Sequence, residues 1–293
     1  MAGKSRFFIA ASRIKKYFQN SRKRVFSAHQ IDEILNENRQ DWNLPQSMNL
    51  DKFIEKGLES NLFNEVVLNF VGSLDKRKLY AVDEASVLEI ALGVRTKTYL
   101  SYFTAVYLNG LTNQLPKTVY LSFEQSVRYQ FEIDNNLTQE SIDSAFAKPQ
   151  RRSNTFAIYN DYTILLHSSK FTDRLGIYTS PGTGLTITNI ERTLIDITVR
   201  PDYSGGVSTV LEAYRNAKER VSINKLISYL KAMKFIYPYW QVVGFYLEHA
   251  GYDKSKLDVF YDNISEFRFY LAYQMNAVKY DLYWKVYYPA GLI

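Results

Sequence analysis

TNIERTLIDITVRPDYSGGVSTVLEAY, residues 188–214, is the stretch that decides how the second half of this chain folds. Thr188 and Glu191 form the T-x-x-E pattern of a capping box, which predicts a helix that opens at Thr188 and is ended by Pro201. Apolar residues recur along it at helical spacing and also occupy its other sides: Ile190, Leu194, Ile197, Ile195 and Val199. We therefore expect a mostly buried helix.

Three charged residues lie within this apolar helix: Glu191, Arg192 and Asp196. Because Arg192 and Asp196 are four residues apart, they share a helix face and can form an ion pair. Each charge would be costly to bury alone, so a structural ion pair is the first interpretation. The alternative is that the pair lies exposed in a cleft and belongs to a functional site.

The pattern E-R-T-L-x-D-x-x-x-R-P, which begins at Glu191 and is followed by a Gly-Gly turn and another amphipathic helix, resembles the signature of the AbiEi antitoxin family. Residues 101–122, SYFTAVYLNGLTNQLPKTVYLS, are similar to a family helix that ends in a G-L-T-x-Q-x-P turn before a strand. Residues 243–251, VGFYLEHAG, resemble another helix end of the family, with Gly251 at the position of a left-handed C-cap glycine. With a strand at Trp284-Lys285-Val286, the resemblance covers roughly residues 90–290.

This resemblance implies an α+β protein with an N-terminal winged helix-turn-helix domain, residues 1–92, and a larger α+β antitoxin domain, residues 93–293. It implies a transcriptional repressor and antitoxin of a type IV toxin–antitoxin system, a form of phage defence by abortive infection. The N-terminal domain would bind inverted repeats in the double-stranded DNA of its own promoter. The C-terminal domain would counteract a nucleotidyltransferase toxin without a stable complex, and Glu191, Arg192 and Asp196 would form its motif.

Length and composition set bounds on the class of protein. A chain of 293 residues is long enough for about two domains, each with its own core. The sequence has no cysteine, which excludes disulfides, thiolate metal ligands and a cysteine nucleophile and suits the cytoplasm. Because no apolar run approaches the roughly 20 residues that span a bilayer, and the N-terminus lacks a secretory core, we expect a soluble cytoplasmic protein without a membrane partner.

Positive charge is concentrated at the N-terminus. Residues 1–30 carry eight basic and no acidic side chains, whereas the whole chain has a net charge of +6, so the remaining residues sum to −2. A polyanion would therefore be held at this end of the chain.

The same end has the pattern of a winged helix. Helices are predicted over residues 6–18, after Ser27, and over residues 47–58 behind the break at Leu44-Pro45. Apolar stretches at 64–71 and 78–82, joined by GSLDKR, predict a hairpin with a basic tip, which would be the wing.

In such a domain one helix reads base edges in the major groove, while the wing and the first helix hold phosphates. The candidate residues on the third helix are Gln46, Ser47, Asn49, Lys52 and Lys56. The candidates for phosphate contacts are Lys15, Lys16, Arg22, Lys23, Arg24, Lys76, Arg77 and Lys78. The alternative is a solvated basic helix and an ordinary hairpin that bind no nucleic acid.

Beyond a connecting helix over residues 84–92, strands are predicted before helices, which favours an α+β domain over a βαβ repeat. The predicted strands are 118–123, 155–158, 163–167 and 185–187, and the helices are 189–200, 206–219, 222–233 and 239–250. Alternating apolar residues predict one further strand over residues 280–288.

Signals for catalysis are weak. The histidines, His29, His167 and His249, lack the spacing of metal ligands, and the glycine-rich SPGTG at 180–184 lacks the G-K-[S/T] ending of a phosphate loop. Gly72-Ser73 is not followed by the D-x-D of a nucleotidyltransferase, and Pro201-Asp202 is not followed by the E-x-K of a nuclease. We therefore expect no enzymatic activity, no cofactor and no metal. The alternative is a metal-dependent nuclease or another nucleic-acid-processing enzyme, in which Glu191 and Asp196 would converge with a third carboxylate.

Overall fold

The computed structural model describes residues 6–72, 74–126 and 137–293. It combines helices with several β-sheets, which confirms the predicted α+β class. The chain forms two compact units. The first unit comprises the residues up to Thr98 together with 154–165 and 180–185, and the second comprises 99–153, 166–179 and 186–293.

The first unit contains four helices and two sets of strands among its described residues. The helices are α1 (Arg6–Asn20), α2 (Ala28–Asn38), α3 (Leu50–Glu59) and α4 (Val87–Gly93). An antiparallel sheet has the order β1-β4-β2, from β1 (Val25–Phe26), β4 (Arg77–Ala81) and β2 (Asn64–Leu68). A second antiparallel ladder joins β3 (Phe70–Val71), β7 (Phe156–Tyr159) and the first residues of β8 (Tyr162–Ser169).

Aromatic side chains fill the core between the helices and the sheet of this unit. Phe18 meets Phe63 edge to face with ring centroids 5.0 Å apart, and Trp42 stacks on Phe53 at 5.9 Å. The inward face of α1 supplies Phe7, Ala10, Ile14 and Phe18, all buried. The rest of α1 carries exposed polar and basic side chains together with Phe8 and Ile9, which are 61% and 63% exposed.

The predicted helix starts and the hairpin are largely confirmed. Ser27 caps α2 in a capping box with Gln30. Strands β2 and β4 pair from Asn64↔Ala81 to Leu68↔Arg77, which confirms the hairpin. The predicted first strand was too long, because β2 ends at Leu68 and the chain then pairs with β7 instead.

The second unit places a mixed ladder of strands beside a group of helices. The ladder has the order β8-β6-β5-β10-β9 and begins with the last residues of β8. The other strands, in this order, are β6 (Thr118–Glu124), β5 (Tyr99–Leu100), β10 (Thr186–Thr188) and β9 (Ile177–Thr179). Its helices are α5 (Tyr102–Leu108), α6 (Gln139–Phe146), α7 (Ile190–Val199), α8 (Val207–Ala217), α9 (Ile223–Met233), α10 (Tyr239–His249) and α11 (Asp258–Tyr261), with 3-10 turns η1 (Pro201–Tyr203) and η2 (Lys254–Lys256).

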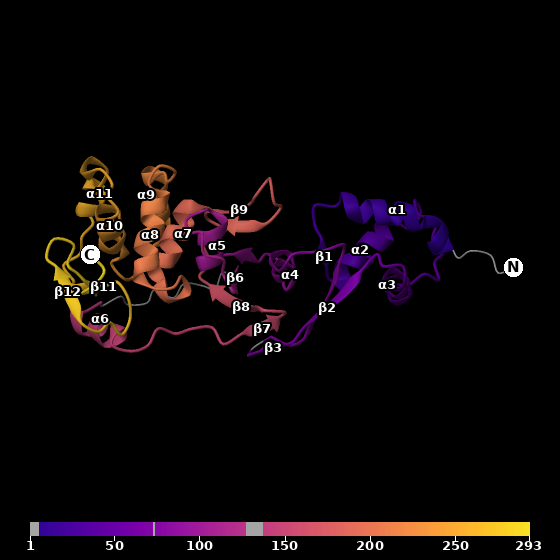
Figure 1. Ribbon diagram of the computed structural model, residues 1–293, viewed down its shortest axis with the longest axis horizontal. Coiled ribbons are helices and arrows are strands. Elements are labelled where there is room, and N and C mark those ends of the chain that lie inside the picture. Colours follow the sequence, from indigo (N-terminus) through magenta and orange to yellow (C-terminus); the bar gives the residue numbers. More distant parts are fainter. Residues whose placement is uncertain (1–5, 73, 127–136) are drawn as a thin grey trace. The chain divides into compact units, whose positions relative to one another are not determined.

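Helix α7, the helix of the opening stretch, is central to this group. It contacts α5, α8, α9 and α10, and these helices lie together in Figure 1. Leu194, Ile195 and Ile197 are completely buried, which confirms the predicted burial. The predicted cap was wrong by one residue: Asn189 caps α7 by accepting from the Arg192 N–H, because Thr188 is still paired in strand β10.

The C-terminal strand prediction was also wrong. Residues 280–288 form a hairpin rather than one strand, with β12 (Val278–Asp281) and β13 (Val286–Pro289) antiparallel and β11 (Phe269–Tyr270) parallel to β13. Between the strands, the Asp281 carboxylate accepts a hydrogen bond from the Trp284 N–H at 2.8 Å, and Lys285 has a φ of 54°. A positive φ does not fit an extended strand, so the chain turns here.

Gly251 follows α10 with a φ of 79°, as the predicted left-handed C-cap requires.

Among the residues described, no helix has the length and apolar character needed to cross a membrane.

Candidate functional site

The exposed face of α1 and the loop after it carry the largest group of predicted phosphate ligands. Lys15 and Lys16 are exposed on α1, and Arg22 and Lys23 are exposed in the loop that leads to β1. The Lys23 ammonium donates to the Gln30 side chain at 2.8 Å, and partial burial lowers the pKa of Lys23. These four side chains therefore present positive charge from one continuous segment.

Two other predicted ligands already have acidic partners. Arg24 pairs with Asp83 at 2.8 Å, and Lys78 pairs with Glu65 across the β2–β4 hairpin at 2.9 Å. The hydrogen bond to Glu65 raises the pKa of Lys78. Exposed pairs of this kind are weak and can be exchanged for a phosphate, but they reduce the net charge that the two residues offer.

The hairpin tip has fewer exposed basic side chains than its sequence predicts. Lys76 is exposed, whereas Arg77 is half-buried at the start of β4. Residue 73, part of the predicted wing, lies outside the described residues.

The third helix differs most from its prediction. It begins at Leu50, so Gln46 and Ser47 precede it and do not lie on its face. Asn49 is its N-cap: the side-chain oxygen accepts the Lys52 N–H at 3.1 Å. Asparagine is favoured at this position because its oxygen satisfies an N–H left free at the helix start. The side chain of Asn49 is thus used within the protein, while Lys52 stays exposed and Lys56 half-buried.

An acidic stripe on α3 was missed from the sequence. Asp51, Glu55 and Glu59 are all exposed and follow one another at intervals of four residues, so they lie along one face of the helix. Their spacing in the sequence was a sufficient signal. Carboxylates repel phosphates, so this side of α3 is not a surface that approaches a DNA backbone.

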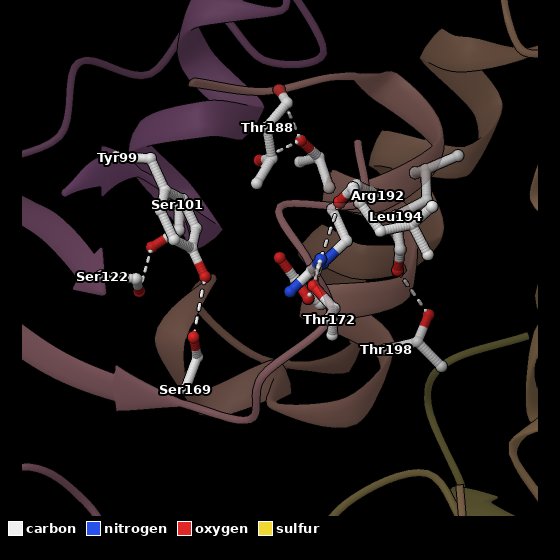
Figure 2. Close-up of polar contacts among 12 residues, drawn as sticks. Tyr99, Ser101, Ser122, Ser169, Thr172, Thr188, Arg192, Leu194 and Thr198 are labelled. Atoms are coloured by element: carbon white, nitrogen blue, oxygen red, sulfur yellow. Dashed lines mark hydrogen bonds and ion pairs between the residues drawn. The ribbon is translucent and has the colours of Figure 1, made fainter. Parts of the chain in front are cut away.

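In the second unit, Arg192 is the centre of a buried polar network. Its Nε donates to the Asp196 carboxylate at 2.8 Å, and its Nη1 donates to the Thr172 hydroxyl at 2.9 Å and to the Leu175 carbonyl at 2.8 Å. Figure 2 shows the side chain pointing toward Thr172. The predicted ion pair is therefore formed, with side-chain exposures of 3% for Arg192 and 11% for Asp196.

Glu124 extends this network to strand β6. Its carboxylate accepts the Thr172 hydroxyl and the backbone N–H groups of Thr172 and Arg174. Burial raises the pKa of Asp196, and the neighbouring Arg192 opposes that rise. The network joins α7 to β6 and to the loop that holds Thr172.

Glu191 points to a different place. It accepts the Ser222 N–H at 3.0 Å and pairs with Lys225 at 3.2 Å, so it fixes the start of α9. The motif carboxylates Glu191 and Asp196 therefore contact separate partners. In the described part of the chain, no three His, Cys, Asp or Glu side chains are grouped as metal ligands.

The predicted G-L-T-x-Q-x-P turn connects α5 to the helices around it. Asn109 donates to the Thr188 carbonyl and the Thr193 hydroxyl, and Arg220 donates to the carbonyls of Asn109 and Gly110. Beside this turn lies an open depression of about 500 Å³. It is lined by polar residues, namely Thr112, Asn113, Gln114, Glu212 and Asn216, with Gly110.

Two separate segments of the resemblance meet at Trp284. A Cβ placed on Gly244 of α10 would lie 2.1 Å from this indole ring, and the indole N–H donates to Glu248. The absence of a side chain at Gly244 therefore makes room for Trp284.

The histidines are dispersed. His29 is exposed near Glu33, and His249 lies 3.5 Å from Asp281. His167 packs against Tyr102 and Tyr203, and burial, with a smaller effect of Arg200, lowers its pKa to about 3.

Comparison with known proteins supports the fold alone. No protein-family model matches the sequence, and no curated protein matches it significantly. Among solved structures, the chain is similar to the RV2827C protein from Mycobacterium tuberculosis, with a TM-score of 0.52 and 14% identity over 95% of this chain and 91% of that one. At this identity the likeness concerns the course of the backbone through both units.

Proposed function

We propose that this chain is a DNA-binding transcriptional repressor whose first unit contains a winged helix-turn-helix. The observation that carries the proposal is the order α1-β1-α2-α3-β2-β3-β4, in which β2 and β4 form the hairpin, combined with the sheet order β1-β4-β2. In a winged helix, three helices are followed by such a hairpin, and a short strand between the first two helices completes the sheet. The basic face of α1 supplies the electrostatic component that binding to duplex DNA requires.

The charges on α3 restrict how this domain would meet DNA. Lys52 and Lys56 are four residues apart and share a face, whereas Asp51, Glu55 and Glu59 form the neighbouring stripe. We infer that the lysine side of α3 enters the groove and that the acidic side faces away from the phosphates. Lys15, Lys16, Arg22 and Lys23 would hold the backbone on one side, and Lys76 on the other.

The second part of the proposal is antitoxin activity of the AbiEi type. It rests on the resemblance of the motifs in the second unit. Their residues lie at buried contacts and turns: Arg192 with Asp196, Glu191 with Lys225, and Gly244 with Trp284. These residues stabilise the unit, so the surface that acts against a toxin is formed by exposed residues around them.

DNA binding is tested with the full chain and a duplex taken from the region upstream of its own coding sequence. We expect a discrete protein–DNA complex in a gel-shift assay. An unrelated duplex of equal length and composition should displace this DNA only weakly. Equal affinity for both duplexes would show that the chain recognises no operator sequence in this region, which would contradict the proposal that it is a repressor.

Antitoxin activity is tested by co-expression with a nucleotidyltransferase encoded beside the chain. The expected result is restored growth without co-purification of the two proteins. Growth arrest despite normal levels of the chain would contradict this part of the proposal, independently of the DNA result.

A further inference from the structure

The C-terminal sheet ends in an open edge strand. Its order is β11-β13-β12, so within the described ranges 6–72, 74–126 and 137–293 β12 has a partner strand on one side only. Ala290 donates its N–H to the Ala277 carbonyl at 2.8 Å, and Lys279 is opposite Tyr288 in the ladder. In an antiparallel pair the backbone groups alternate in direction, so the N–H and C=O groups of Val278 and Tyr280 point away from β13.

Apolar side chains crowd this edge. Val278 is 43% exposed, Tyr280 37% and Leu282, at the start of the turn, 83%. Residues at intervals of two share a face of a strand, so Val278 and Tyr280 extend the same face of the sheet. A flat edge with exposed apolar residues is a surface that pairs with another strand.

A row of tyrosines crosses the sheet on that face. Tyr270 is opposite Tyr287, which in turn is opposite Tyr280. The ring centroids are 4.9 Å and 4.8 Å apart, which is the spacing of neighbouring strands. The row stops at Tyr280 because the sheet stops there, and one more strand would continue it.

We propose that β12 pairs antiparallel with β12 of a second copy of this chain, with Tyr280 on the two-fold axis. In this register Tyr280 is opposite Tyr280 of the other copy, and the two residues exchange both outward hydrogen bonds. The tyrosine row then runs through six strands without a break. Val278 of each copy comes opposite Leu282 of the other, which covers both exposed apolar side chains.

The charges on the opposite face agree with the same register. Lys279 is exposed on β12, and pairing centred on residue 280 brings it opposite Asp281 of the other copy. The Asp281 side chain is 18% exposed, because its carboxylate also accepts the Trp284 N–H and lies 3.5 Å from His249. Each copy supplies one lysine and one aspartate, so the register brings opposite charges together twice. A lysine on an edge strand ordinarily prevents pairing, but here the partner strand provides its counter-charge.

The first test is the mass of the full chain in solution, measured by light scattering after gel filtration. The wild-type chain is expected to be a dimer that dissociates on dilution. Lys279→Glu places like charges opposite each other and Tyr280→Pro removes an outward N–H without breaking the β12–β13 ladder, so both variants should be monomeric. Lys256→Glu, an equal change of charge at an exposed residue of η2, should stay dimeric.

The second test uses the absence of cysteine from the sequence. Hydrogen-bonded residues in an antiparallel pair have Cα atoms about 5.5 Å apart, within the range of a disulfide. Tyr280→Cys should therefore form a disulfide-linked dimer under mild oxidation about a hundredfold faster than Leu282→Cys, whose two copies would be offset by about 13 Å along the strands.

A monomeric wild-type chain, a dimer that survives both Lys279→Glu and Tyr280→Pro, or equal crosslinking of the two cysteine variants would each overturn the proposal. Because neither test contains DNA or toxin, these results are independent of the proposed function.

Discussion

The indole of Trp284 occupies the space in which a side chain of residue 244 would stand: a Cβ on Gly244 would lie 2.1 Å from the ring. Trp284 is completely buried, and its indole N–H donates to Glu248. Glu248 lies one turn after Gly244 in α10. Trp284 thus fixes the hairpin of β12 and β13 to α10, together with the contacts of Gln241 with Lys285 and of His249 with Asp281.

Gly244→Ala should therefore destabilise the chain. Insertion of a methyl group into a filled core forces side chains from their preferred positions and costs about 1–3 kcal/mol. The measurement is the midpoint of urea unfolding, with Gly291→Ala as the control because a Cβ there meets nothing within 4 Å. Equal midpoints for the two variants would show that α10 and Trp284 are not in close contact.

Asn49→Ala separates helix capping from base reading. Because the Asn49 oxygen caps α3, we expect a loss of about 0.5–2 kcal/mol in the free energy of unfolding. Asn49→Asp keeps a capping oxygen and should retain that stability. If Asn49→Ala unfolded like the wild type but lost its preference for one DNA sequence, Asn49 would be a base-reading residue.

Removal of one charge from the buried Arg192–Asp196 pair tests whether this part of the α7 motif stabilises the fold or belongs to a functional site. Asp196→Asn leaves the Arg192 guanidinium buried without its counter-charge, which should cost about 3–5 kcal/mol. Asp202→Asn is the matched control, because Asp202 pairs with the exposed Arg152 and such a pair contributes at most about 1 kcal/mol. A normal melting temperature for Asp196→Asn together with lost toxin rescue would make the pair part of a working site.

Acid should destabilise the chain through His167. Its pKa is about 3 in the folded protein and about 6.5 when unfolded, so between these values only the unfolded chain takes up the proton. The free energy of unfolding is therefore not reduced by His167 above pH 6.5. As the pH falls below 6.5, protonation of His167 in the unfolded chain lowers the free energy of unfolding by up to about 1.4 kcal/mol per pH unit. Unfolding of the wild type and of His167→Gln should be compared from pH 7 to pH 4, and parallel curves would show that His167 is protonated in the folded state.

The sequence predicted the long elements well because each has strong periodicity. Helices α7, α8, α9 and α10 lie within a few residues of their predicted bounds, since apolar residues recur every three or four positions, and Pro201 and Gly251 lie just beyond the ends of α7 and α10. Ser27 and Gly251 were correct for a similar reason, because capping depends on a few neighbouring residues.

Errors arose where distant residues decide between two local possibilities. Thr188 and Asn189 can both cap a helix, and the pairing of Thr188 with strand β9 leaves the cap to Asn189. Alternation over residues 280–288 suits one strand, but the bond from Trp284 to Asp281 and the burial of the indole make a turn there. The partners of Glu191 and of Arg24 come from other elements, so no local pattern contained them.

The central claim, that the first unit holds duplex DNA through its basic face, is tested most directly by a salt titration of the full chain. Each phosphate contact contributes a slope of about −0.9 when the logarithm of affinity is plotted against that of salt concentration. Lys15→Gln with Lys16→Gln should therefore make the slope shallower by about 2, whereas Lys254→Gln with Lys256→Gln, two exposed lysines of the second unit, should leave it unchanged. Equal slopes for the two double variants, or a larger change for the second, would contradict the account.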